Sequence, residues 1–488
     1  MEFLDYFSLL QFTLCIFYVI YPHTNFLLKS WCGGIVATMS KEDKLNERQR
    51  EAVLHTDGPL LIVAGAGAGK TLTLTHRIAH LISRGVSPRQ ILAVTFTNKA
   101  AAEMKSRIRA ILQSHKFHET PLSMEEQPFV GTFHALGVFI LRHHGSHIGI
   151  KKNFSIKDKE ASLSLIKEAM RNRALDPKQY APRKFQVIIS RQKGNLASPE
   201  TYGEQFSTHP FFSFVTEVWK EYEQLLKKEN SLDFDDLILN PVALLKTSAE
   251  VLTHYQKRWT HIHIDEYQDT NHAQYTLSRL LSLAHKNICV VGDYDQVIYS
   301  WRGANIENIL RFEKDYPHAK VVLLEENYRS TKIILDAANE VIKKNKLRKE
   351  KKLFTQKGEG EKLSLALAYD EEEESRHVAL KTHELIKNGV QAEDIAVLYR
   401  ANFQSRALEE AFLAQNIPYQ IIGTRFFERK EVKDMLAYIN AALNTESLSD
   451  IKRIINVPPR GIGKAATAKL FSGQKNTLPE SMQEKVDN

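Results

Sequence analysis

A glycine-rich turn between an apolar run and a helix-forming run restricts this chain to few folds. "PLLIVA" (59–64) has the length and composition of a buried strand, "GAGAGKT" (65–71) is a tight turn, and the following "LTLTHRIAHLI" has helical periodicity. Strand, turn and helix in this order distinguish a P-loop from a chance glycine cluster. The strict pattern G-x-x-x-x-G-K-[ST] is broken only at its first position, Ala64, where a methyl group can fit the end of a strand.

This turn predicts a nucleotide-binding site. Glycines let successive backbone N–H groups point at phosphate oxygens, and the following helix adds the positive end of its dipole. Lys70 can reach the β- and γ-phosphates, and the Thr71 hydroxyl can ligate Mg²⁺. The alternative is a glycine-rich turn within an ordinary core. We expect ATP and Mg²⁺ as cofactors, held by Ala64, Gly65, Ala66, Gly67, Ala68, Gly69, Lys70 and Thr71.

Two adjacent carboxylates follow a second strand-like run, "HIHID" (261–265). Neighbouring side chains at the end of a strand can both project into the crevice where parallel sheets bind ligands. Asp265 is a hard oxygen ligand suited to Mg²⁺, and Glu266 can orient or deprotonate the attacking water. An acidic pair alone is common on surfaces, but an apolar strand before it and a P-loop upstream favour a catalytic role.

A third run, "NICVVGD" (287–293), precedes a polar loop with flat side chains. Gln296 is predicted to contact the γ-phosphate through its amide. Tyr299, Trp301 and Arg302 are predicted to form a stacking platform, since aromatic faces hold single-stranded bases of any sequence. The alternative interpretation of Trp301 is a core side chain.

Alternating apolar runs and helical segments predict an α/β fold of parallel sheets with helices on both faces, and the phosphate loop places this fold in the P-loop NTPase class. Helical patterns dominate between about 113 and 210, which suggests an inserted helical subdomain. A second αβ series follows residue 312, with strands expected at "LSLALAY" (363–369) and "DIAVLYR" (394–400).

The net charge indicates which kind of partner this protein binds, and its cysteine content indicates the cellular compartment. The net charge of +8, from 66 basic and 58 acidic residues, favours polyanionic partners. The basic run "KKNKLRKEKK" (343–352) is interpreted as a solvated helix end, with nucleic-acid contact as the alternative. Three scattered cysteines form neither a disulfide framework nor a zinc motif, so a cytoplasmic location is expected.

The first 38 residues differ from the rest. "FLDYFSLLQFTLCIFYVIYP" (3–22) is apolar over about the shortest length that can span a bilayer, but Glu2 and Asp5 stand where a secretory signal needs positive charge. Three interpretations stay open: sequence that is not part of the working protein, a membrane anchor, or a buried packing segment.

Several longer blocks occur in a characteristic order from "LNERQREAV" (45–53) to "VPPRGIGKAA" (457–466). Between them lie "TFTNKAAAEM", "GTFHALG", "LDFDDLI", "LEENYRS" and "FFERKEVKDMLAYI". Together these blocks resemble the UvrD/Rep/PcrA family of superfamily 1 DNA helicases. The resemblance implies an ATP-dependent enzyme that steps 3′ to 5′ on single-stranded DNA and opens 3′-tailed duplexes. Repair or replication proteins are implied as further partners.

The resemblance also implies roles for individual residues. Gln49 would contact the adenine edge, and Arg329 would reach the γ-phosphate from the second motor domain as an arginine finger. The DNA track would include Thr95, Phe96, Asn98 and His134. By themselves, Phe96 also fits a core position at a strand end and Arg329 an ordinary salt bridge.

The family architecture implies two RecA-like motor domains with helical insertions, and the second motor domain is expected to be incomplete here. The expected boundaries are a leader at 1–38, the first motor domain at 39–112 and 211–311, a helical insertion at 113–210, the second motor domain at 312–446 and the start of a second insertion at 447–488.

Two further family motifs, a Q-G-L-E-F-like block and a Y-V-A-x-T-R-A-like block, do not occur before Asn488. We therefore expect a fragment that binds ATP and single-stranded DNA weakly, hydrolyses ATP very slowly and does not unwind DNA. Three alternatives stay open: a DNA-binding, weakly ATP-binding remnant, part of a helicase–nuclease machine, and a membrane-tethered protein.

Overall fold

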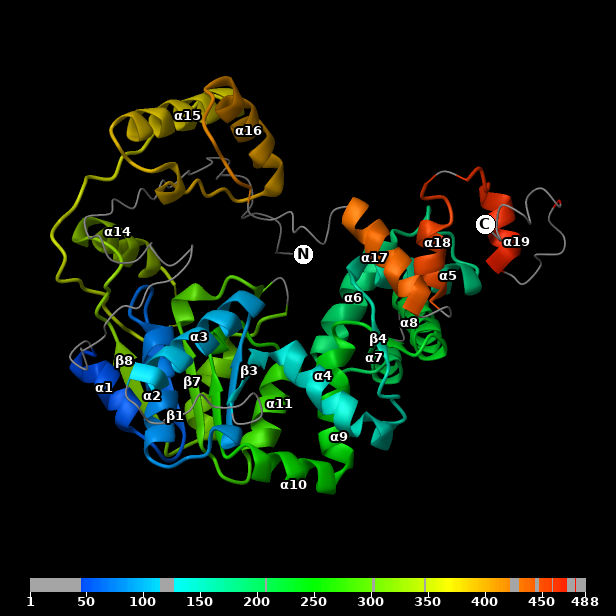
Figure 1. The fold of residues 1–488 in the computed structure, drawn as a ribbon, viewed down its shortest axis with the longest axis horizontal. Helices are drawn as coiled ribbons and strands as arrows, with labels where there is room; N and C mark the ends of the chain where they lie inside the picture. Colours follow the sequence, from blue (N-terminus) through cyan, green and yellow to red (C-terminus); the bar gives the residue numbers. More distant parts are fainter. Residues whose placement is uncertain are drawn as a thin grey trace. The chain divides into compact units, whose positions relative to one another are not determined.

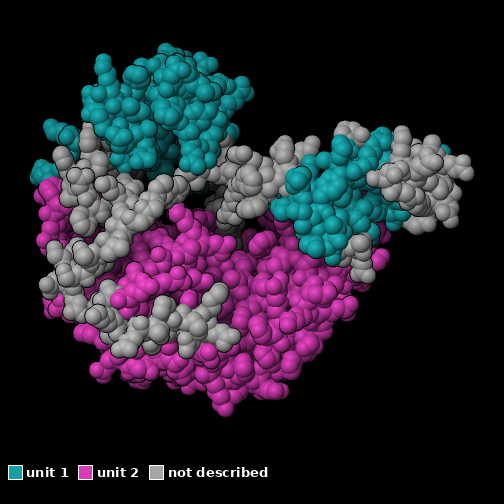
Figure 2. All heavy atoms as spheres, viewed as in Figure 1, with its two compact units in different colours: residues 1–38, 359–488 teal, residues 39–358 magenta. Residues whose placement is uncertain are grey.

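The computed structural model describes residues 45–114, 127–206, 209–300, 303–345, 348–421, 430–443, 447–458, 460–471 and 479. The apolar leader at 1–38 lies outside these residues. Within the described residues, no helix is long and apolar enough to cross a membrane. The chain divides into two compact units, residues 39–358 and residues 1–38 with 359–488, which Figure 2 shows in magenta and teal.

The larger unit is built on a six-stranded parallel sheet, which confirms the predicted α/β P-loop class. The strand order is β3-β2-β6-β7-β1-β8, and every pair is parallel. The strands are β1 (Leu60–Ala64), β2 (Ile91–Thr95), β3 (Phe129–Thr132), β6 (His261–Ile264), β7 (Ile288–Gly292) and β8 (Lys320–Leu324).

Both faces of this sheet are covered by helices. Leu61 and Val63 of β1 face one hydrophobic cluster, whereas Leu60 and Ile62 face another. Because both faces are buried, the strands are apolar throughout rather than alternating. One face is covered by α1 (Glu47–Leu54), α2 (Lys70–Ser83) and α3 (Asn98–Ser114), and the other by α4 (Phe133–His144), α9 (Asp236–Thr247), α10 (Ala249–Arg258), α11 (His272–Ser282), α12 (Glu307–Leu310) and α13 (Phe312–Asp315) (Figure 1).

A separate helical group has its own core. It contains Phe185, Trp219 and Tyr222, all buried. The helices are α5 (Lys159–Asn172), α6 (Pro182–Gly194), α7 (Pro199–Gln205) and α8 (Pro210–Lys228), with a short sheet of β4 (Ser155–Ile156) and β5 (Ser231–Leu232) nearby (Figure 1). β3 and α4 fall inside the 113–210 range expected for a helical insertion, but they belong to the large sheet and its covering layer.

The edge strand β8 lies beyond residue 311, where the first motor domain was expected to end. It pairs with β1 over its whole length, from Leu60 opposite Lys320 to Ala64 opposite Leu324. The compact unit then continues through α14 (Lys332–Ile342) to Gly358. The structure thus brings the chain after β8 to the same sheet edge as the P-loop.

The smaller unit is helical in its described part. Its helices are α15 (Glu371–Lys387), α16 (Ser405–Ala414), α17 (Lys430–Leu443), α18 (Leu448–Ile454) and α19 (Lys464–Phe471). The expected strands at 363–369 and 394–400 are not formed: neither segment belongs to a sheet among the described residues, and Asp394 ends a 3₁₀ turn. Leu365, Leu367 and Tyr369 are exposed by 67%, 75% and 96%, so the apolar alternation that predicted a strand is not buried here.

The parallel arrangement decides where the functional side chains lie. All six strands end at one edge, so the loops that follow them are neighbours along that edge in the order of the strands. The loops after β6, β7, β1 and β8 carry the predicted ATP-site residues except Gln49, which lies in α1, and the predicted DNA contacts lie at or after the ends of β2, β3 and β7.

Candidate nucleotide and nucleic-acid site

The P-loop needs glycine for two physical reasons. Gly67 and Gly69 have φ angles of +68° and +79°, in the left-handed region that favours glycine. Neighbouring groups also approach closely: a Cβ added at Gly67 would lie 2.6 Å from the Asn327 amide nitrogen, and one at Gly65 would lie 2.1 Å from a Leu353 methyl carbon. The predicted roles of these glycines as phosphate ligands stay predictions.

Gln49 lies directly beside this loop. It is buried in α1, and its Nε2 donates a 3.1 Å hydrogen bond to the Ala68 carbonyl. A Cβ added at Gly69 would come within 2.7 Å of the same nitrogen. The geometry places Gln49 at the P-loop backbone, and its contact with an adenine edge stays a prediction.

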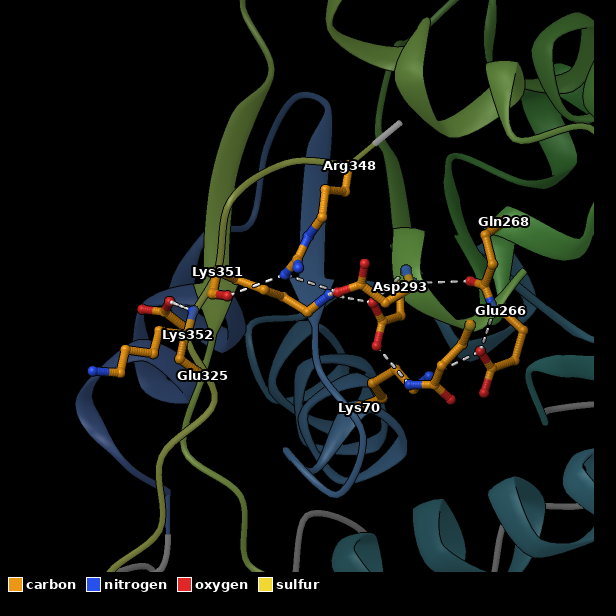
Figure 3. A network of polar contacts seen from close by, with 10 residues as sticks. Lys70, Glu266, Gln268, Asp293, Glu325, Arg348, Lys351 and Lys352 are labelled. Atoms are coloured by element: carbon orange, nitrogen blue, oxygen red, sulfur yellow. Dashed lines mark hydrogen bonds and ion pairs between the residues drawn. The ribbon is translucent and has the colours of Figure 1, made fainter. Parts of the chain in front are cut away.

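Lys70 and Glu266, predicted from separate motifs, are in direct contact. The Lys70 ammonium lies 2.9 Å from Glu266 Oε2, which also accepts a 2.9 Å hydrogen bond from Gln268 Nε2 (Figure 3). Gln268 is buried, and its Oε1 accepts a 3.0 Å hydrogen bond from the Asp293 backbone N–H. Gln268 therefore links the loop after β6 to the loop after β7.

Asp265 is a buried carboxyl group beside this ion pair. Burial raises its pKa to about 6, and the Glu266 carboxylate adds to the effect, while Lys70, the Glu266 N–H and a hydrogen bond with Thr71 oppose it. Asp265 and Thr71 thus bring two hard oxygen atoms together, which fits a Mg²⁺ ion completed by water and phosphate oxygens. In the described part of the chain, no group of three or more His, Cys, Asp and Glu side chains is arranged for a metal.

We predict that Asp265→Asn stabilises the nucleotide-free protein. The folded pKa of about 6 exceeds the ordinary value of 3.8, so this carboxyl contributes stability below about pH 4 that is lost as the pH rises through 6. At pH 8 the buried charge costs on the order of 1–3 kcal/mol. Thermal melts without Mg²⁺ and ATP should give the variant a higher Tm than the parent at pH 8 and an equal one at pH 4. An equal Tm at both values would contradict this.

Gln296 is positioned by Asp293. Its Nε2 donates a 2.6 Å hydrogen bond to Asp293 Oδ2, in the 3₁₀ turn that follows β7. Asp293 is itself almost completely buried. The amide therefore lies at the same sheet edge as Lys70 and Glu266, and its contact with a γ-phosphate stays a prediction.

Arg329 lies in a loop that covers the P-loop. Asn327 Nδ2 donates to the Ala66 carbonyl at 2.6 Å, and the Tyr328 N–H donates to the Gly67 carbonyl at 3.0 Å. Asn327 Oδ1 accepts from the Arg329 N–H at 2.8 Å, while the Arg329 side chain is exposed. Arg329 and the P-loop lie in the same compact unit of the structure, and the role of Arg329 as an arginine finger stays a prediction.

The predicted DNA contacts that the structure describes lie at or after the ends of β2, β3 and β7. Phe96 stacks on Tyr299, with ring centroids 5.1 Å apart and planes at 26°. Asn98 is exposed at the start of α3. Thr95 is buried, and its hydroxyl has no hydrogen-bond partner within the described structure. Trp301 and Arg302 lie outside the described residues, so the structure does not place them.

His134, in the first turn of α4, lies edge-on to Phe234 with ring centroids 5.5 Å apart. Burial lowers the pKa of His134, so its imidazole is neutral at pH 7. Phe234 is 49% exposed and was not predicted from the sequence. A neutral His134 imidazole carries no charge that would attract phosphate groups. Beside the exposed Phe234 ring, it can therefore stack on bases.

The sequence interpretation missed four residues that complete the site: Gln268, Asp293, Asn327 and Lys351. Asp293 could have been predicted as a site residue, because it follows a buried strand as Asp265 does. The sequence pattern around Lys351 was misleading, because the basic run that contains it was interpreted as a solvated helix end. The Lys351 side chain is in fact only 2% exposed.

Comparison with known proteins identifies the family. Residues 45–317 match the UvrD/REP helicase N-terminal domain, and residues 322–482 match the UvrD-like helicase C-terminal domain. The chain belongs to the UvrD/REP helicase family. The resemblance predicted from the sequence blocks is therefore confirmed.

Individual relatives agree with this family. The ATP-dependent DNA helicase PcrA of Bacillus subtilis (strain 168) is 48% identical over 431 residues, which are 88% of this chain and 57% of that protein. The proteins of the same name from Staphylococcus aureus (strain Mu50) and Staphylococcus epidermidis are each 46% identical over 87% of this chain. The aligned part is 57% of the length of each of these relatives.

Proposed function

We propose that this UvrD/REP-family chain is an ATP-dependent DNA motor that hydrolyses Mg²⁺-ATP and moves 3′ to 5′ on single-stranded DNA. The observation that carries the proposal is the 2.9 Å contact between Lys70 and Glu266 at the carboxyl edge of the sheet, beside Asp265. A phosphate-binding cation and a candidate general base are thereby within reach of one triphosphate. The activity belongs to the cytoplasm, where three scattered cysteines stay reduced.

The ion pair suggests how ATP would enter. Triphosphate oxygens would compete with Glu266 for the ammonium of Lys70, whose side chain is 11% exposed. Once Lys70 turns to phosphate, Glu266 retains the hydrogen bond from Gln268 and is available to accept a proton from water. Asp265 and Thr71 would hold Mg²⁺, which neutralises charge on the phosphates.

The stacked pair of Phe96 and Tyr299 supports a contact with DNA bases. Both rings lie on loops after strands of the sheet that carries the P-loop, so a change at the nucleotide can be transmitted to them through short segments. Tyr299 follows Gln296 by three residues and Phe96 follows β2 directly. We propose that the rings of Phe96 and Tyr299 either separate to admit a base between them or stay together and stack against one face of a base.

Replacing Tyr299 by alanine should weaken binding to single-stranded DNA by roughly tenfold, because stacking contributes about 1–3 kcal/mol per base. The measurement is fluorescence anisotropy with a labelled oligonucleotide at fixed salt. Tyr369→Ala is the matched control, because Tyr369 is 96% exposed and outside the proposed track. Unchanged affinity in Tyr299→Ala would remove this ring from the track.

Strand displacement tests the proposed function. The purified chain is mixed with Mg²⁺-ATP and duplexes that carry either a 3′ or a 5′ single-stranded tail. We expect any ATP-dependent strand displacement to occur on the 3′-tailed duplex and not on the 5′-tailed duplex. Displacement of the 5′-tailed duplex would contradict the polarity, and ATP-independent binding without hydrolysis would favour a DNA-binding protein instead.

A further inference from the structure

The segment 348–354 touches several parts of the nucleotide site. The Phe354 carbonyl accepts a 2.7 Å hydrogen bond from the Asn327 N–H, and Leu353 packs against Gly65. Lys351 and Arg348 form ion pairs with the loop after β7. This segment is remote in sequence from the P-loop, and it reaches the site because β8 pairs beside β1.

Lys351 is the most buried cation of this segment. Its side chain is 2% exposed, and its ammonium forms an ion pair with Asp293 Oδ1 (Figure 3). A second ion pair joins the same ammonium to Asp295 Oδ2. Arg348 adds a second cation, 3.2 Å from the same Asp295 oxygen. A buried ammonium is tolerated only when its charge is compensated, so this arrangement fixes the positions of both carboxylates.

Because Gln296 is hydrogen-bonded to Asp293, the position of the Asp293 carboxylate also fixes the Gln296 amide. One carboxylate oxygen accepts from Lys351 and from the Asp295 N–H at 2.9 Å, while the other accepts from Gln296 Nε2 at 2.6 Å. A carboxylate only accepts hydrogen bonds, so the nitrogen end of the Gln296 amide must face Asp293. The Gln296 carbonyl oxygen and its second N–H are then oriented away from Asp293.

The neighbours of Lys351 in the basic run behave differently. Lys349 is 37% exposed and pairs with Glu313, a contact of the solvated kind. The Lys352 side chain is exposed and extends away from Asp293, although its backbone N–H donates to Glu325 (Figure 3). Burial therefore distinguishes Lys351 from these neighbouring lysines of the basic run, which the sequence alone does not.

We propose that Lys351 is a positioning residue for ATP hydrolysis: through Asp293 it fixes the amide of Gln296 at the γ-phosphate end of the nucleotide site. The proposal rests on the proposed function, since it concerns the same ATP site. In the described structure the Lys351 ammonium forms its ion pairs with Asp293 and Asp295, so its effect on Gln296 should pass through Asp293. Its loss should lower the rate of hydrolysis more than the affinity for ATP.

The kinetic test compares Lys351→Met, Lys351→Arg and Lys352→Met with the parent chain. Lys351→Met should lower kcat by on the order of tenfold to a hundredfold, because a displacement of about 1 Å in a positioned group can cost about 10²-fold. The Kd for Mg²⁺-ATP should change by less than about threefold. Lys351→Arg should restore part of kcat, and Lys352→Met should equal the parent. A loss of kcat and affinity in equal proportion would overturn the proposal.

A double-mutant cycle separates positioning from general destabilisation. In a Gln296→Ala background, Lys351→Met should have little further effect on kcat, because the group it positions is absent. Full additivity of the two losses would overturn the proposal. Should Lys351→Met fail to fold because two buried carboxylates lose their cation, the Lys351→Met/Asp295→Asn variant removes one of those charges and enters the same cycle.

A structural readout keeps this proposal distinct from the proposed function. With ¹⁵N-labelled glutamine in the full chain, the Gln296 side-chain amide resonance, assigned by its loss in Gln296→Ala, should shift in Lys351→Met and stay in place in Lys352→Met. If the parent chain hydrolyses no ATP but this shift occurs, the proposed function fails and the positioning contact stands. An unshifted resonance in Lys351→Met overturns the contact whatever the hydrolysis rate.

Discussion

Lys70→Ala should abolish ATP hydrolysis and leave binding to single-stranded DNA nearly unchanged. Lys70 is the P-loop cation, and its ammonium already lies 2.9 Å from the candidate base Glu266. Without it the β- and γ-phosphates lose their charge partner and the general base loses its ion pair. Electrostatic groups of this kind typically contribute on the order of 10²–10³ in rate. The measurement is phosphate release over time under saturating Mg²⁺-ATP.

A matched control for Lys70→Ala is Lys343→Ala, at a lysine whose side chain is 64% exposed and pairs with Glu340 at the end of the same helix. Its hydrolysis rate should equal that of the parent. Equal rates for Lys70→Ala and the parent would show that the P-loop residues do not form the hydrolytic site.

Arg329→Ala should reduce hydrolysis by as much as an arginine finger contributes, on the order of 10³–10⁵-fold. Its exposed side chain follows a loop that hydrogen-bonds the carbonyls of Ala66 and Gly67, so the guanidinium begins close to the phosphate-binding backbone. Arg329→Lys should recover little, because a lysine lacks the planar fork that binds phosphate oxygens. Single-turnover hydrolysis measures this effect separately from product release.

The comparison variant for Arg329 is Arg311→Ala. Arg311 is 63% exposed and pairs with Glu307 one helical turn away, so its removal should be neutral. A change of less than about threefold in Arg329→Ala would exclude a finger role and leave an ordinary surface arginine.

The parts of the site that the sequence predicts are those set by local patterns. The strand before "GAGAGKT" and the strand before Asp265 and Glu266 each bury a continuous apolar run, and a parallel sheet brings their carboxyl ends to one edge. The same logic predicts the loop after β7. These inferences need no knowledge of which strand lies beside which.

The remaining features depend on long-range pairing. Asn327 reaches the P-loop, and Lys351 reaches the loop after β7, only because β8 joins the first sheet beside β1, and strand order is not encoded in local periodicity. The predicted strands at 363–369 and 394–400 show the opposite error. Their apolar alternation satisfies a strand pattern, but no neighbouring strand in the described structure supplies ladder hydrogen bonds.

The most direct test of a DNA-stimulated ATP site is the rate of Mg²⁺-ATP hydrolysis by the purified 488-residue chain with and without single-stranded DNA. Bases that bind at Phe96 and Tyr299 should act on the loop that carries Gln296, three residues before Tyr299. We predict slow hydrolysis that rises saturably with single-stranded DNA, and no hydrolysis in Lys70→Ala under either condition. A rate unaffected by DNA, or one retained in Lys70→Ala, would contradict it.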